Sequence, residues 1–143
     1  GWQSMPGGGT TDYAVDIFHE AIKNRKYTCF LSPDRTLPMM YMADAIKATI
    51  GIMTAPIEKI KIRTSYNISA FHFSPEELAT KIELYFPEFK INYSPDKRDL
   101  LASSWPNSID DQGARNDWGW SPNYDFNKMV DDIMLNLKKK YNQ

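Results

Sequence analysis

The sequence contains very little cysteine, since Cys29 is the only one among 143 residues. A single thiol excludes an internal disulfide framework and fits a reducing intracellular compartment. Its neighbours have a strand-like apolar pattern, so we predict that the thiol is buried. Long apolar runs are also absent, because no segment approaches the roughly 20 residues that span a bilayer. Nor does the sequence contain the charged-then-apolar leader of a signal peptide.

An excess of charge of either sign is missing as well. Seventeen basic residues face eighteen acidic ones, which gives a formal net charge of −1. A balance of this kind argues against a dedicated partner among nucleic acids or membrane surfaces. The basic run Lys138 to Lys140 lies in the last turn of an expected helix, where it suits the helix dipole.

Several catalytic and metal-binding motifs are absent. His19 and His72 have no partners at ligand spacing, so we predict no metal site. There is no Walker loop, and no nucleophile elbow of the G-x-S-x-G type. Two Tyr-x-x-x-Lys matches, which begin at Tyr93 and Tyr124, are interpreted as coincidental, because one contains Pro95 and the other begins at a helix cap. We therefore assign no catalytic residue to this chain.

What the sequence does contain is the composition of an ordinary globular protein, with 42% hydrophobic and 24% charged residues. We treat residues 1–143 as a single unit. Helix-like and strand-like apolar periods alternate, which predicts an α/β fold. The expected helices cover residues 10–25, 42–54, 74–86, 96–104, 110–120 and 125–141. The expected strands cover residues 26–31, 36–41, 60–69 and 89–93.

The sequence Ser-Pro-Glu-Glu at residues 74–77 predicts a helix start, with Ser74 as the cap and Glu77 completing a capping box. In the helices 10–25, 74–86 and 125–141 we expect the apolar residues to lie on one face, towards the core. In the helix 42–54 we expect Ile46, Ile50 and Met53 to face inward. In the segment 60–69 the period-two alternation predicts a strand. No strand precedes the glycine loop at residues 7–9, which indicates a cut through a larger fold and predicts exposed apolar surface or an exposed sheet edge.

The glycine loop is the first candidate site. Glycine lacks a Cβ atom, so the backbone of Gly9 and its neighbours can approach a ligand closely. Thr10 or Thr11 is expected to be the N-cap of the helix that follows, whose first amides then point outward and attract a carboxylate or phosphate. The alternative is that Asp12 already occupies this helix end and that the glycines only form a bend.

The second candidate is Trp105, in the stretch SWPNS of an expected loop. Its ring is suited to covering a pocket and excluding water from a reaction. The alternative is an ordinary core tryptophan. The adjacent pair Asp110 and Asp111 is interpreted as helix capping rather than as an acid/base dyad, because neighbouring side chains point in different directions.

Four long stretches carry a family resemblance: PGGGTTDYAVDIF, LPMMYMADAIKAT, SYNISAFHFSPEELA and SWPNSIDDQGARNDWGW. They resemble the carboxyl-terminal part of the NAD-dependent L-threonine 3-dehydrogenases, within the extended short-chain dehydrogenase, or sugar-epimerase-like, superfamily. The resemblance implies the substrate-binding portion of a Rossmann-type enzyme whose nucleotide-binding half is absent from this sequence. It also implies that Gly9, Thr10 and Thr11 hold threonine and that Trp105 closes over it.

The same resemblance implies NAD as cofactor, L-threonine as substrate and a homodimer of the full-length enzyme. The reaction would oxidise L-threonine to 2-amino-3-oxobutanoate, in the mitochondrial matrix of a eukaryote or the cytoplasm of a bacterium. One alternative is the lobe of a nucleotide-sugar epimerase or dehydratase, with Arg35 and Arg63 as candidate contacts to a pyrophosphate. Another is a non-catalytic remnant or an interaction module.

Overall fold

The computed structural model describes residues 1–142, which form a mixed α/β arrangement. A parallel pair joins β1 (Lys26–Cys29) to β4 (Lys90–Tyr93), and an antiparallel pair joins β2 (Leu37–Met39) to β3 (Phe71–Phe73). The helices are α1 (Tyr13–Asn24), α2 (Met42–Thr54), α3 (Pro75–Glu83), α4 (Lys97–Ala102), α5 (Gln112–Trp118) and α6 (Phe126–Lys140), with a short 3₁₀ turn η1 (Ile57–Lys59).

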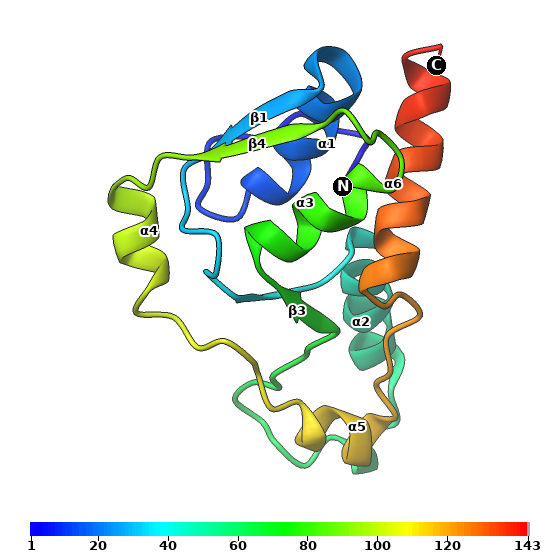
Figure 1. Ribbon diagram of the computed structural model, residues 1–143. Helices are drawn as coiled ribbons and strands as arrows, with labels where there is room; N and C mark the ends of the chain where they lie inside the picture. The colour runs from blue at the N-terminus through cyan, green and yellow to red at the C-terminus, as the bar shows by residue number, and fades with distance from the viewer. Residues whose placement is uncertain (143) are drawn as a thin grey trace.

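Figure 1 shows β1 and β4 side by side at one end of the molecule, with α1 and α3 next to them and α6 along one side. Helices α2 and α5 lie at the opposite end. The main core gathers the apolar faces of α1, α3 and α6 against the strands. A smaller second core forms around Ala48, Ala114 and Trp120. The expected α/β class and the expected apolar faces of α1, α3 and α6 are confirmed.

Local sequence signals fix several element ends. Ser74 accepts a hydrogen bond from the amide of Glu77, and the Glu77 carboxylate accepts one from the amide of Ser74. This reciprocal box starts α3, with Pro75 in its first turn. Asp125 caps α6 in a similar way, through the amide of Lys128. Cys29 is fully buried, as predicted, and burial raises the pKa of its thiol to about 11.

The predicted inward face of α2 is wrong. Ile46, Ile50 and Met53 are exposed, and the buried members of the helix are Asp44 and Ala48. Both carboxylate oxygens of Asp44 accept backbone hydrogen bonds at 2.9 Å from the turn that precedes α6. The helix is therefore anchored through its small and polar side, which periodicity alone did not favour.

The predicted strand at residues 60–69 does not form in the described chain. The amides of Lys61 and Ile62 donate to the hydroxyl of Tyr66, at 2.9 and 3.0 Å, and that hydroxyl donates to Asp117. A β-ladder needs backbone groups that face a neighbouring strand. Since these amides are taken by a side chain, the extended residues only lead into β3, which begins at Phe71.

Candidate functional site

The glycine loop folds onto the side chain of Asp12. One carboxylate oxygen, Oδ2, accepts hydrogen bonds from the amides of Gly7 and Gly9, at 2.7 and 2.8 Å. The Asp12 amide in turn donates to the Gly9 carbonyl at 3.1 Å. Gly8 adopts a φ of 97°, a left-handed conformation that a residue with a Cβ rarely takes. The loop is thus a closed turn that ends at Asp12, immediately before α1.

This geometry corrects the expectation for the helix start. The N-cap of α1 is Asp12, not Thr10 or Thr11. Since the amides of Gly7 and Gly9 are bonded inside the protein, they do not form a free cluster for a ligand carboxylate. The negative charge of Asp12 also occupies the favourable end of the helix dipole, as the alternative held.

The side-chain hydroxyls of Thr10 and Thr11 are the groups of this loop that can still bind a ligand. Thr10 and Thr11 are both half-buried, and within residues 1–142 neither hydroxyl has a hydrogen-bond partner in the protein. A hydroxyl can donate to a carboxylate or accept from an ammonium group. The loop therefore retains two adjacent groups that suit a small zwitterionic ligand.

Trp105 is not a core tryptophan, because 43% of its surface is exposed. It follows α4, where its amide donates to the carbonyl of Ala102 at 3.0 Å. No hydrogen bond or ring contact joins it to the glycine loop within residues 1–142. The chain thus presents the two predicted parts of the site on separate segments, as an exposed ring and as a pair of hydroxyls.

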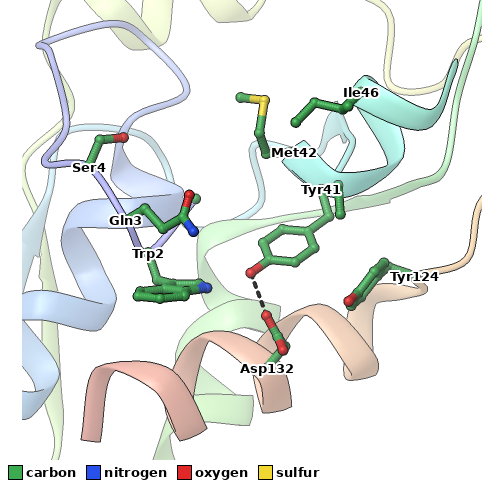
Figure 2. A pocket seen from close by; sticks show the side chains of 10 residues that line it. Trp2, Gln3, Ser4, Tyr41, Met42, Ile46, Tyr124 and Asp132 are labelled. Atoms are coloured by element: carbon green, nitrogen blue, oxygen red, sulfur yellow. Dashed lines mark hydrogen bonds between the residues drawn. The ribbon is translucent and has the colours of Figure 1, made fainter. Parts of the chain in front are cut away.

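A cavity of about 280 Å³ lies elsewhere, between residues 1–4, the start of α2 and the first half of α6. Figure 2 shows Tyr41 in its centre, with its hydroxyl directed at Asp132 and the ring of Tyr124 beside it. The Tyr41 hydroxyl donates to Asp132 Oδ2 at 2.6 Å, and the two tyrosine rings meet edge to face at 4.8 Å. None of the four predicted site residues lines this cavity.

The Tyr41 hydroxyl serves as a hydrogen-bond donor in that cavity. Burial raises its pKa well above the ordinary value of a phenol, and the hydrogen bond to Asp132 raises the pKa further. Sequence reasoning missed this group because its members come from three distant segments. Only the tertiary packing brings them together.

The two Tyr-x-x-x-Lys matches do not form catalytic pairs. Burial raises the pKa of Tyr93 to about 12, whereas a catalytic tyrosine requires a lowered pKa. In the second match, the ring of Tyr124 packs on Tyr41, and Lys128 lies 3.9 Å from Asp125. Their interpretation as coincidental fits this geometry.

The basic residues named for a pyrophosphate are not gathered into a site. The guanidinium of Arg35 binds Asp99 through two hydrogen bonds, Nε to Oδ1 at 2.9 Å and Nη2 to Oδ2 at 3.2 Å. Arg63 is exposed on the segment that leads to β3. A phosphate at Arg35 would have to compete with the carboxylate of Asp99, which already accepts two hydrogen bonds from the guanidinium.

The pair Asp110 and Asp111 has structural roles. Asp110 accepts from the amide of Gln112 at the start of α5. Asp111 binds Arg115 and the indole N–H of Trp120. Across residues 1–142, no group of three or more histidine, cysteine, aspartate or glutamate side chains is placed to hold a metal ion. In the same residues, no helix has the length and apolar character needed to cross a membrane.

Comparison with known proteins places this geometry in context. No protein-family model matches the sequence. The mitochondrial L-threonine 3-dehydrogenase of Bos taurus is 51% identical over 135 residues, which are 94% of this chain and 36% of the bovine one. An uncharacterized epimerase/dehydratase of Staphylococcus haemolyticus is 41% identical over 94% of this chain and 43% of its own.

A solved structure agrees with these sequence matches. The GalE-like L-threonine dehydrogenase of Cupriavidus necator, in its apo form, superimposes with a TM-score of 0.93 at 53% sequence identity. The match covers 96% of this chain and 50% of that one. The chain is thus homologous to the L-threonine 3-dehydrogenases over nearly its whole length, while it spans between 36% and 50% of theirs.

Proposed function

We propose that this chain is the carboxyl-terminal, substrate-binding part of an NAD-dependent L-threonine 3-dehydrogenase. The observation that supports this most is the 53% identity, at a TM-score of 0.93, to a threonine dehydrogenase of known structure. The complete enzyme would oxidise the 3-hydroxyl of L-threonine to a ketone, giving 2-amino-3-oxobutanoate, and pass the hydride to NAD. We propose that it acts as a homodimer, in the mitochondrial matrix if the source is a eukaryote and in the cytoplasm if it is a bacterium.

The residues of this chain do not fit a dinucleotide site by themselves. A dinucleotide fold places a glycine-rich turn between a strand and a helix, with free amides facing the pyrophosphate. Within residues 1–142 no strand leads into the glycine loop, and the amides of Gly7 and Gly9 bind Asp12. We therefore assign NAD binding to the part of the enzyme that this chain does not span, and we describe no step of the reaction through it.

The task of this chain would be to hold threonine in place. The hydroxyls of Thr10 and Thr11 would bind its carboxylate, and Asp12 lies next to them, with a charge that suits its ammonium group. Gly9 would contribute by having no side chain. The atoms nearest to a Cβ added there belong to Asp12, at an ordinary 3.5 Å, and φ at Gly9 is not positive. The fold itself does not require glycine at this position, whereas a ligand that approaches the backbone closely would.

Trp105 would cover the bound substrate from a second segment. Its ring is exposed in this chain, although a large aromatic ring normally gains stability by being buried. Closure over threonine would bury the ring and exclude water from the reacting hydroxyl. Orientation of the hydroxyl towards the cofactor is the contribution to rate that such a lobe can make.

The proposed role of Thr10 is tested in a chimera in which this chain replaces the matching part of the Cupriavidus necator enzyme. We expect Thr10→Ala to raise the KM for threonine about tenfold or more, because a hydrogen bond to a charged group contributes about 1.5–3 kcal/mol. The KM for NAD should stay within about twofold, and Thr10→Ser should restore threonine binding.

Steady-state kinetics at varied threonine and varied NAD give both constants. Thr80→Ala, on the exposed side of α3, is the matched control. An unchanged KM for threonine in the Thr10→Ala chimera would remove Thr10 from the site. Binding of a UDP-sugar but not of threonine to the chimera, measured by calorimetry, would favour the epimerase alternative instead.

For Trp105 we expect a loss of catalytic efficiency without a loss of stability. In the same chimera, Trp105→Ala should lower kcat/KM for threonine about tenfold or more, while Tm changes by no more than about 2 °C, because the ring is far from fully buried. Trp105→Phe should recover part of the activity.

Trp120→Ala provides the contrast for that experiment. Trp120 is buried and donates to both Ser69 and Asp111, so its removal should lower Tm whatever happens to kinetics. If Trp105→Ala lowers Tm as much as Trp120→Ala does, or leaves kcat/KM at the level of the unaltered chimera, the covering role is rejected.

A further inference from the structure

A buried histidine joins the middle of α1 to the end of α6. His19 lies on α1 with only 1% of its surface exposed. Its Nδ1 is 2.9 Å from the hydroxyl of Tyr141, the residue that follows α6. The two rings meet edge to face, with their centroids 5.9 Å apart. Since 122 positions separate the two residues, this contact exists only while the end of α6 lies on α1.

Tyr141 is the residue that attaches the last turn of α6 to α1. Its amide donates to the carbonyl of Leu137 at 2.9 Å, which continues the helix. The ammonium group of Lys23, on α1, lies over its ring at 5.0 Å from the centroid. Beyond Leu137, both Lys139 and Lys140 are exposed. The hydroxyl and the ring of Tyr141 therefore carry the contacts of this turn with α1.

The second ring nitrogen of His19 makes the contact sensitive to protonation. Nε2 is buried and, within residues 1–142, has no hydrogen-bond partner. A neutral imidazole can donate its one proton from Nδ1 to Tyr141 and leave Nε2 as a bare acceptor, whereas an imidazolium carries a proton on both nitrogens. The proton on Nε2 would then be a buried donor without an acceptor, on a charged ring. Burial of such a group is strongly unfavourable.

The charged groups that act on His19 come from α1 and α6. Lys23 of α1 and Lys140 of α6 oppose a further positive charge, whereas Asp16 and Glu20 of α1 favour one. Burial has the largest effect and, together with the two lysines, lowers the pKa of His19 below its ordinary value near 6.5. The closed arrangement of α1 and α6 therefore favours the neutral ring.

We propose that His19 and Tyr141 form a pH-sensitive latch, which holds the last turn of α6 on α1 while the imidazole is neutral and releases it when the imidazole is protonated. A protonated Nε2 gains hydrogen bonds to water only if its surroundings open, and a helix end opens at a lower free energy than the middle of a helix. The attachment is at full strength above about pH 6.5, the unfolded value, and weakens as the pH falls below it. This inference does not depend on the threonine-binding roles of Thr10 and Trp105.

Nuclear magnetic resonance of this chain tests the latch, since His19 and His72 are the only histidines in its sequence. The imidazole signals of His19 should titrate with a midpoint below about 6.5. The amide signals of residues 138–142 should move towards unfolded values with the same midpoint. Hydrogen exchange of the Tyr141 amide, corrected for its intrinsic pH dependence, should become about threefold faster or more between pH 7.5 and 5.5, because one proton changes an opening equilibrium by at most tenfold per pH unit.

His19→Gln keeps a hydrogen-bonding side chain that does not titrate, so the signals of residues 138–142 should stay constant over this range. His19→Phe serves the same purpose if the glutamine variant does not fold. Tyr141→Phe keeps the ring but loses the hydroxyl, and should speed exchange at pH 7.5 while reducing its pH dependence. His72→Gln is the matched control, because His72 is exposed on β3, and it should retain the full pH response.

Three results would overturn the proposal. One is a titration of His19 that leaves the signals of residues 138–142 unchanged. Another is a pH response of these residues that persists in both His19 variants. The third is a midpoint for His19 at or above about 6.5, because the closed contact would then not favour the neutral ring. All readouts come from the histidines and the end of α6, so they are independent of whether the chain binds threonine.

Discussion

Replacing Phe73 with alanine should destabilise this chain by about 3–5 kcal/mol, the range for removing a fully buried phenylalanine. Phe73 ends β3 with 1% of its surface exposed. Its ring stacks on Phe126 at 4.8 Å and meets Tyr13 edge to face at 6.4 Å. One side chain therefore ties the second strand pair to α6 and to the first residue of α1. Since a domain is stable by only about 5–15 kcal/mol, the loss should take a large share of the total.

Urea unfolding followed by circular dichroism gives the free energy directly. Phe71→Ala is a close control, because Phe71 lies two residues earlier on the same strand, has the same ring and is only half-buried. Phe71→Ala should lower the free energy of unfolding clearly less than Phe73→Ala does. If the two alanine variants lose the same free energy, Phe73 is not the junction that its contacts indicate. Phe73→Leu should recover much of the loss, because it refills most of the volume.

Where sequence signals act locally, they predicted the structure well. The pattern Ser-Pro-Glu-Glu predicted both the start of α3 and its capping box, since every group involved lies within four residues. The bounds of α2 were predicted correctly at both ends, with Pro56 just beyond the last turn. The apolar stripe of α6 was predicted in the same way, because helix periodicity is a property of one segment.

Predictions that depend on a neighbour outside the segment failed. Periodicity found the two sides of α2 but could not tell which one faces this chain, and size suggested the wrong side. The alternation at residues 60–69 is real, yet a strand needs a partner, and here the hydroxyl of Tyr66 takes the amides of Lys61 and Ile62. In both cases the periodicity of the segment was identified correctly, but the neighbour that the segment packs against or pairs with was not predicted.

In the candidate site, too, the local features could be predicted from the sequence and the long-range contacts could not. The closed turn at Gly8 and the helix that follows could be expected from glycine and from periodicity. The sequence left open whether Asp12 accepts hydrogen bonds from the amides of Gly7 and Gly9. An aspartate at a helix start can cap the helix or bind the loop before it, and the sequence does not distinguish the two. The cavity around Tyr41 and Asp132 could not be expected at all, since those residues are 91 positions apart.

The ion pair of Asp99 should be the most sensitive polar feature of the chain. Asp99 is almost buried on α4, and it accepts from the guanidinium of Arg35 and from both the amide and the hydroxyl of Ser32. Asp99→Ala would leave these donors without their acceptor. Removing one partner of a buried pair costs about 3–5 kcal/mol, and the partial exposure of Arg35 places our expectation at about 2–4 kcal/mol.

This cost should depend on pH with a defined sign. The hydrogen bonds from Arg35, followed by those from Ser32, hold the pKa of Asp99 well below its usual range, although burial opposes them. A depressed pKa in the folded state adds stability above the unfolded value near 4, and that stability is lost as the pH falls below it. The difference in unfolding free energy between the unaltered chain and Asp99→Ala should therefore be constant from about pH 5 to 7 and shrink between about pH 4 and 2. Urea titrations at pH 7, 4 and 3 measure it. The control is Asp34→Ala, at an exposed position of the loop that carries Ser32 and Arg35.

A pH-independent difference would mean that Asp99 acts through packing rather than through its charge. The distinction bears on the site, because Asp99 belongs to the helix from which the Trp105 loop extends. Its bonds to Ser32 and Arg35 fix that helix to the loop after β1. In the chimera, Asp99→Asn keeps the shape of the side chain but loses its charge, so it should weaken this attachment. A fall in kcat/KM for threonine in that variant, with the KM for NAD unchanged, is expected if the position of Trp105 depends on α4.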